Sequence, residues 1–175
     1  MKFSAALVAA AMSAAPAAAL PADTTSDTDR GAKTFGSLTE LQSKYARGII
    51  RQAKKEHLGS QGCMAGIATA LVESTLLMHA NYAVPDSLVY EYDRLGHDAD
   101  SIGLFQQRAS IYPNIKCSMD VACSARQFFE GMKRVPDWRY MDVGKLCQEV
   151  QRSENPERYH EFINQAKGIC QQGGF

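Results

Sequence analysis

The feature that most constrains this chain is an apolar segment, residues 63–78, in which Glu73 is the only charged side chain. A run of this composition favours a helix that is buried on nearly all sides. An ionised carboxylate without a partner is costly in such surroundings, so the group tends to remain protonated instead. Because a carboxylic acid that stays neutral can donate a proton in a reaction, Glu73 is the first candidate for a functional residue.

The N-terminal residues 1–19 have the composition of a secretory signal peptide. Lys2 supplies a positive start, an alanine-rich apolar stretch follows, and Ala17-Ala18-Ala19 matches a cleavage site, with Ala22 as a second possible end. Residues 23–36 are polar and lack periodicity, which predicts a flexible leader before a single domain at residues 37–175. We therefore expect a secreted, extracellular protein without a membrane-spanning segment in its mature form.

Charge and residue spacing argue against several classes of partner. Removal of residues 1–19 takes away Lys2 and no acid, so 18 basic residues remain against 19 acidic ones, a net charge of −1. Bulk electrostatics then gives no support for nucleic-acid binding. The four histidines show no metal-ligand spacing, and the chain has no phosphate-binding glycine loop. We expect a monomer without a metal or cofactor.

Five cysteines in a chain with a secretion signal predict two disulfides and one remaining thiol. Most of the pairing is left open by the sequence. Cys117 and Cys123 bracket a short segment that a disulfide could close, so this is the first expected pair. Cys63 begins the apolar segment and is expected to be a buried free thiol.

Helix patterns dominate the remaining chain, which predicts an all-α or α-dominated domain, α+β at most. The expected helices cover residues 37–57, 63–79, about 118–135, 142–154 and 155–168. Ser37 and Glu40 form the expected capping box of the first helix, and Gly59 and Gly62 separate it from the second. Residues 102–107 are expected to form a short strand or an extended turn.

Two of the later helices have their own start signals. Asp142 is the expected N-cap of the helix at residues 142–154. Asn155 and Pro156 read as the N-cap and first-turn proline of the last helix. These signals predict that each helix begins directly at the named residues.

Two segments carry the residues with chemical potential. Glu73-Ser74 lies near the end of the apolar helix, and Gly103-Leu104-Phe105-Gln106 follows about 30 residues later. Together they resemble the lysozyme superfamily, and in particular small secreted lysozyme-like domains related to the soluble lytic transglycosylases. Val135-Pro136-Asp137-Trp138, and Val150-Gln151-Arg152-Ser153 before Tyr159, are also similar to bacterial members. The resemblance covers roughly residues 45–165.

The resemblance implies a lysozyme-like domain that cleaves the β-1,4 bond between N-acetylmuramic acid and N-acetylglucosamine in peptidoglycan. Glu73 would protonate the glycosidic oxygen, a role for which lysozyme itself is the precedent. The segment with Gly103 and Gln106 would line the sugar groove opposite this acid. Hydrolysis and transglycosylation both remain open, as does chitin in place of peptidoglycan. A non-catalytic peptidoglycan- or chitin-binding protein is the alternative from another functional class.

The second catalytic carboxylate is less clearly marked. Asp100 stands close to the place where two-acid lysozymes carry an aspartate, but alignment on Gly103 puts Ser101 at that position. In the transglycosylase branch the acetamido group of the substrate assists instead. Asp100 therefore stabilises the transition state, positions a water, or does neither.

Several polar and aromatic residues are candidates for substrate binding, and Ser101 is one of them. Ser74 either hydrogen-bonds the acid or holds the neighbouring loop. The amide of Gln106 can donate to and accept from sugar groups, or it satisfies the backbone of its own loop. Tyr92 is an expected platform for a sugar ring, as are Tyr82, Tyr90 and Tyr112.

Overall fold

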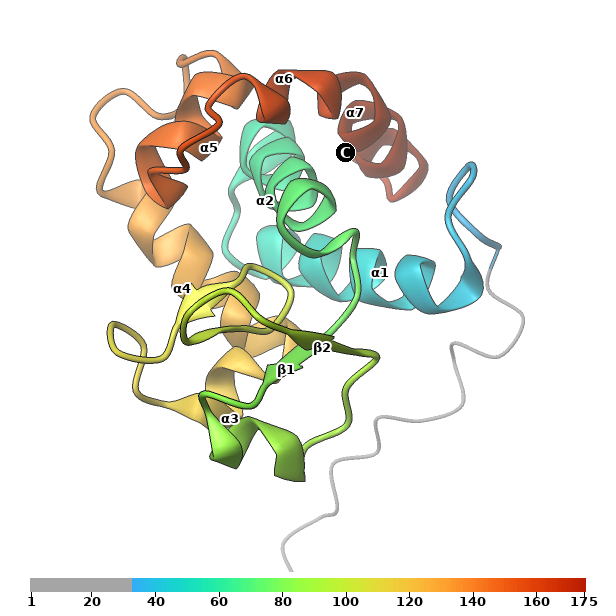
Figure 1. Ribbon diagram of the computed structural model, residues 1–175. Helices are drawn as coiled ribbons and strands as arrows, with labels where there is room; N and C mark the ends of the chain where they lie inside the picture. The colour runs from blue at the N-terminus through green and yellow to red at the C-terminus, as the bar shows by residue number, and fades with distance from the viewer. Residues whose placement is uncertain (1–32) are drawn as a thin grey trace, which may run out of the picture. The chain divides into compact units, whose positions relative to one another are not determined.

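The computed structural model describes residues 33–175, and helices dominate this part of the chain (Figure 1), which confirms the α-dominated class. The expected signal peptide and residues 23–32 of the leader lie outside the described residues. The elements in chain order are α1 (Glu40–Lys55), α2 (Gly59–Ser74), β1 (His79–Asn81), the 3₁₀ helix η1 (Pro85–Val89), β2 (Arg94–Gly96), β3 (Ser101–Ile102), β4 (Gln107–Arg108), α3 (Ile115–Ser118), α4 (Val121–Lys133), α5 (Val143–Gln151), α6 (Arg158–Glu161) and α7 (Ile163–Gln172). Within residues 33–175, no helix is long and apolar enough to cross a membrane.

The apolar segment forms most of α2, the central helix of the domain. Figure 1 shows α2 between α5, α6 and α7 at one end of the domain and β1, β2 and α3 at the other. It packs against α1, α4, α5 and α7, as a helix without a polar face must. A Cβ atom at Gly66 would lie 2.9 Å from the ring of Phe129 and 3.0 Å from Ile49, so this glycine allows α1 and α4 to approach α2 closely.

The start of α2 differs from the prediction. The chain turns at His57, which has a φ of 54°, and Gly59, with a φ of 67°, begins the helix. Gly62 lies inside the helix instead of breaking the chain before it. A Cβ atom at Gly62 would lie 2.4 Å from the Cβ atom of Leu58. Gly62 therefore makes room for the buried Leu58 side chain that fills the corner between α1 and α2.

The capping box of α1 is also placed differently. Thr39 Oγ1 accepts from the backbone N–H of Gln42 at 3.2 Å, and Gln42 Oε1 accepts from the backbone N–H of Thr39 at 2.9 Å. The prediction of Ser37 with Glu40 is wrong because the preceding turn buries Phe35 and Leu38 in the core. The helix can begin only after Leu38, which moves the cap to Thr39.

The C-terminal half confirms one of the two predicted N-caps. Asp142 caps α5 by accepting from the backbone N–H of Lys145 at 2.9 Å. The single helix predicted from Asn155 is wrong: the chain forms α6 only at Arg158, and Phe162 separates it from α7. Because α7 packs along α2 whereas α6 packs on α5, one straight helix could not make both contacts.

Each of the two disulfides joins a pair of helices. Cys117–Cys123 joins α3 to α4, which confirms the expected local pair, and Cys63–Cys170 joins α2 to α7. The expectation that Cys63 is a free thiol is therefore wrong, because the packing of α7 on α2 brings Cys170 beside it. The free cysteine is Cys147 in α5, and burial raises the pKa of its thiol to about 12.

The short strands build the region opposite the end of α2. Strand β1 pairs in parallel with β2, and β3 pairs antiparallel with β4 through Ser101↔Arg108 and Ile102↔Gln107. The prediction of a short strand or extended turn at residues 102–107 is confirmed, because the chain pairs at both ends and turns between them. This turn is the part of the strand region that meets α2.

Candidate active site

Glu73 lies in the last turn of α2, where its side chain is half-buried. The hydroxyl of the fully buried Tyr159 in α6 donates to Glu73 Oε1 at 2.5 Å. The side chain of Gln151, at the end of α5, also hydrogen-bonds Glu73, and its Nε2 donates to the carbonyl oxygen of Phe105 at 2.9 Å. Three elements thus converge on a single carboxyl group.

The electrostatic environment of Glu73 favours its neutral form. Burial is the largest influence and raises its pKa, and the negative charge of Asp98 acts in the same direction. The hydrogen bonds from Tyr159 and Gln151 and the positive charge of Arg158 oppose this effect, but the pKa remains raised. The carboxyl group therefore keeps its proton at a higher pH than an exposed glutamate, as a proton donor requires.

Ser74 connects α2 to the turn between β3 and β4. Its Oγ lies 2.8 Å from the carbonyl oxygen of Leu104 and 3.0 Å from that of Ala70. The side chain is buried, so of the two roles left open by the sequence the structure displays the one in which Ser74 holds the loop. It thereby fixes the distance between Glu73 and the Gly103–Gln106 turn.

Gly103 begins this turn in a conformation and a space that only glycine fits. Its φ is +78°, and an added Cβ atom would lie 2.1 Å from the carbonyl oxygen of Ser118. Its backbone N–H donates to the carbonyl oxygen of His79 at 2.8 Å, which joins the turn to β1. The glycine of the sequence motif is thus needed for the close approach of two backbone segments.

We expect Gly103→Ala to lower the free energy of unfolding by about 3 kcal/mol, the sum of a left-handed backbone and an overpacked contact. Urea unfolding followed by circular dichroism would measure this loss. Gly168→Ala is the matched control, because an added Cβ atom there meets nothing within 4 Å and φ is not positive. Equal stability of the two variants would contradict the account of the turn.

Gln106 closes the same turn. Its φ is 47°, and its Nε2 donates to the carbonyl oxygen of Gly103 at 2.9 Å. One amide hydrogen is therefore used within the loop, and the half-buried side chain is held in place by it. The amide oxygen of Gln106 lies close to Gly96 in β2, 3.7 Å from the position that an added Cβ atom would take there.

Neighbouring residues of the hairpin hold the carboxylate of Asp100. Asp100 forms an ion pair with Arg108 across the β3–β4 pair and accepts from the backbone N–H of Ser110 at 2.7 Å. The hydrogen bonds from Arg108 and Ser110 hold its pKa well below the usual range. These contacts engage the Asp100 carboxylate within the β3–β4 hairpin.

Asp98 is the second carboxylate in the electrostatic environment of Glu73. The buried Ser101 donates to Asp98 Oδ2 at 3.4 Å, so the residue aligned with the expected aspartate supports another acid instead. The amide of the buried Asn81 donates to the carbonyl oxygens of Asp98, Ala99 and Ser101, which fixes the loop. No local pattern distinguishes Asp98 from the four other acids of residues 80–101, so its place near Glu73 could not be predicted from the sequence.

The remaining predicted residue, Tyr92, is exposed between η1 and β2. Tyr82, after β1, is exposed as well.

Tyr159, Gln151 and Arg158 complete the surroundings of Glu73. The first two belong to motifs that the sequence analysis quoted but did not assign to the site. Among residues 33–175, no group of three histidine, cysteine, aspartate or glutamate side chains is arranged to hold a metal ion.

Comparison with known proteins adds no family assignment: no protein-family model and no curated protein sequence matches this chain.

We expect Tyr159→Phe to raise the pKa of Glu73 further, because the hydroxyl that stabilises the ionised carboxylate is removed. If Glu73 acts as an acid, the alkaline limb of the pH–rate profile then moves to higher pH. The maximal rate should fall by about tenfold, the effect of one hydrogen bond to a charged group. An unchanged alkaline limb in steady-state assays across the pH range would contradict this role of Tyr159.

Proposed function

We propose that this protein is a secreted lysozyme-like enzyme that cleaves the β-1,4 bond between N-acetylmuramic acid and N-acetylglucosamine in peptidoglycan, with Glu73 as the general acid. The observation that carries the proposal is the half-buried Glu73 carboxyl, whose pKa is raised and which receives hydrogen bonds from Tyr159 and Gln151. The order of the Glu-Ser and Gly-Leu-Phe-Gln segments supports the same class of enzyme. The two disulfides and the N-terminal sequence support secretion.

In the proposed reaction, Glu73 transfers its proton to the glycosidic oxygen while the bond from that oxygen to C1 of the N-acetylmuramic acid breaks. The leaving sugar departs with a free hydroxyl group, and positive charge develops at C1. Tyr159 and Gln151 then stabilise the Glu73 carboxylate that remains. A water molecule adds to C1 in hydrolysis, or the C6 hydroxyl of the same sugar adds to it in transglycosylation. In either case the proton of the attacking hydroxyl returns to Glu73.

The test is incubation of the purified protein with bacterial sacculi and with chitin oligomers, followed by mass spectrometry of the soluble products. Fragments with reducing ends indicate hydrolysis, and fragments with 1,6-anhydro ends indicate transglycosylation. Release of either from sacculi supports the proposal, and release from chitin alone changes the substrate. Binding to sacculi without any released fragment would refute the enzyme and leave a glycan-binding protein.

Substitutions of Asp98 and Asp100, the two candidate partners of Glu73, should have different effects on the pKa of Glu73. We expect Asp98→Asn to lower the pKa of Glu73, because the negative charge that raises it is removed, and to move the alkaline limb of the pH–rate profile to lower pH. Asp100→Asn is the matched control and should leave this limb in place. A shift of the alkaline limb with Asp100→Asn and none with Asp98→Asn would show that Asp100, and not Asp98, is the second carboxylate that acts on Glu73.

A further inference from the structure

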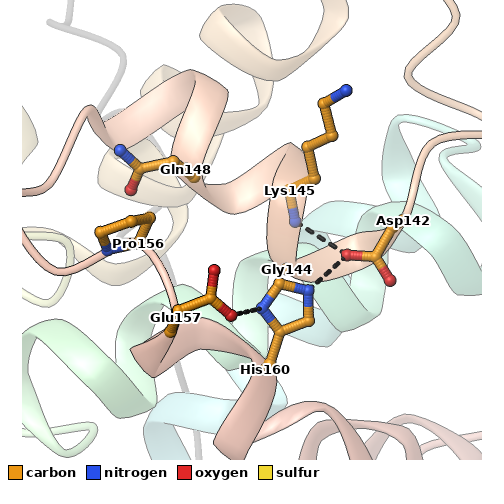
Figure 2. Close-up of a pocket in the computed structure, with 7 residues that line it drawn as sticks. All are labelled: Asp142, Gly144, Lys145, Gln148, Pro156, Glu157 and His160. Carbon is orange, nitrogen blue, oxygen red and sulfur yellow. Dashed lines mark hydrogen bonds and ion pairs between the residues drawn. The ribbon is translucent and has the colours of Figure 1, made fainter.

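His160 lines a pocket beside α5 and α6. The pocket has a volume of about 370 Å³ and lies between α5 and the chain leading into α6 (Figure 2). Its lining consists of Asp142, Gly144, Lys145, Gln148, Pro156, Glu157 and His160. Neither Glu73 nor its hydrogen-bond partners line it, but α5 and α6 each contribute residues to both the pocket and the candidate active site.

His160 joins α6 to the start of α5 through side-chain contacts. Its Nε2 lies 2.8 Å from Asp142 Oδ1, and its Nδ1 lies 3.5 Å from Glu157 Oε2. Figure 2 shows the imidazole between these two carboxylates. Asp142 Oδ1 is also the acceptor that caps α5, so the same oxygen fixes the start of one helix and the side chain of another.

Gly144 allows the imidazole ring of His160 to pack closely against α5. A Cβ atom at Gly144 would lie 2.6 to 2.7 Å from three atoms of the imidazole ring. The ring therefore packs directly on the backbone of α5, which any other residue at position 144 would prevent. Van der Waals contact and hydrogen bonding act together at this point.

Helix α6 also carries Tyr159, whose hydroxyl donates a hydrogen bond to Glu73. Tyr159 and His160 are neighbours in α6 and contact different elements: Tyr159 reaches Glu73 in α2, and His160 reaches Asp142, the N-cap of α5. With four residues, α6 is far too short to be stable without tertiary contacts. Its position must therefore depend on the contacts of these two side chains and its packing neighbours.

We infer that His160 is a positioning residue for the general acid, which holds α6 on α5 through Asp142, Gly144 and Glu157 so that the Tyr159 hydroxyl reaches Glu73. The inference rests on the proposed function for its catalytic consequence, although the positioning itself is independent of it. His160 contacts Asp142 and Glu157, whereas the hydroxyl that hydrogen-bonds Glu73 belongs to Tyr159. The charged groups that surround His160 are Asp142, Glu157 and Lys145. Removal of His160 should consequently affect Glu73 through the displacement of Tyr159.

The test is a titration of the Glu73 side-chain carboxyl by NMR, with ¹³C-labelled glutamate and with Glu73→Gln to assign the signal. We expect His160→Ala to raise the pKa of Glu73 by more than half of the increase caused by Tyr159→Phe. His160→Gln, whose amide can still donate to Asp142, should stay near the wild-type value. In the double variant with Tyr159→Phe, removal of His160 should add no further increase.

An unchanged Glu73 titration in His160→Ala would overturn the inference, and so would an equal increase in the Tyr159→Phe background. Gly144→Ala provides a second variant that displaces the imidazole without removing it, and it should shift the titration in the same direction. Thermal unfolding of each variant confirms that the folded protein is titrated. The readout needs no activity, so a wild-type protein that releases no glycan would refute the proposed function while the NMR result still decides the positioning.

Discussion

Glu73→Gln is expected to reduce the rate of glycan release from sacculi by about 10²- to 10⁴-fold, the usual contribution of a positioned general acid. The amide has nearly the shape of the carboxyl group, and its oxygen can still accept from the Tyr159 hydroxyl. It cannot supply a proton to the glycosidic oxygen. The loss should therefore appear in kcat, with little change in binding to sacculi.

Glu149→Gln is a matched control, because it makes the same chemical change on the exposed face of α5. Both variants are assayed with the same sacculi over the same pH range, and the released fragments are counted by their new ends. Wild-type rates in Glu73→Gln would show that Glu73 is not the acid, even if the enzyme class is correct.

The same substitution has an expected effect on stability that depends on pH. The folded-state pKa of Glu73 is raised above its ordinary value of 4.5, so the folded protein holds this proton more tightly than the unfolded chain. The resulting contribution to stability is fully present below pH 4.5 and is lost as the pH rises through the folded-state pKa. Urea unfolding of wild type and Glu73→Gln at pH 4 and pH 7 should show the variant gaining relative stability at pH 7.

Removal of the Cys63–Cys170 disulfide is expected to cost about 4 to 5 kcal/mol of unfolding free energy, because the bond closes a very long loop. The two cysteines are separated by 107 positions, and both are buried between α2 and α7. In the chain-entropy description, a long loop restricts the unfolded state more than a short one. The double variant Cys63→Ala with Cys170→Ala avoids an unpaired thiol at the site.

The second disulfide supplies the internal comparison. Cys117 and Cys123 are separated by only 6 positions, so replacing both with alanine should cost about 2 kcal/mol. Urea unfolding of the two double variants, under identical conditions, measures the difference. A larger loss from the short loop than from the long one would contradict the argument from loop length.

The parts of the fold that local sequence patterns predicted are those whose cause is local. The composition of residues 63–78 was sufficient to predict a buried helix, because no face of it could be solvated, but the helix ends at Ser74 and not at residue 79, since Thr75 and Leu76 have a left-handed φ of 55°. Asp142 as an N-cap and the Cys117–Cys123 pair depend only on residues a few positions apart. The capping box at Thr39 was missed because the preceding turn, which buries Phe35 and Leu38, decides where α1 begins.

The residues of the candidate site also differ in whether neighbouring sequence identifies them. Glu73 was identified from its neighbours in the chain, because one charge in an apolar helix is a local anomaly. Tyr159 is 86 positions away, and its contact with Glu73 exists only because α6 is held between α2 and α5. Asp98 and Asp100 have similar surroundings in sequence, yet the pairing of β3 with β4 gives Asp100 to Arg108 and leaves Asp98 in the environment of the acid.

The sequence by itself determined the helical class and the buried central helix, and it singled out Glu73 within that helix, because hydrophobic patterning and an isolated charge act over a few turns of chain. Only the tertiary structure decided that Cys63 pairs with Cys170, that Ser74 holds the Gly103 turn, and that Tyr159 donates to Glu73. Each of these contacts joins residues at least 30 positions apart. Such contacts form only when helices pack in one particular arrangement, and that arrangement follows from the packing of the whole core.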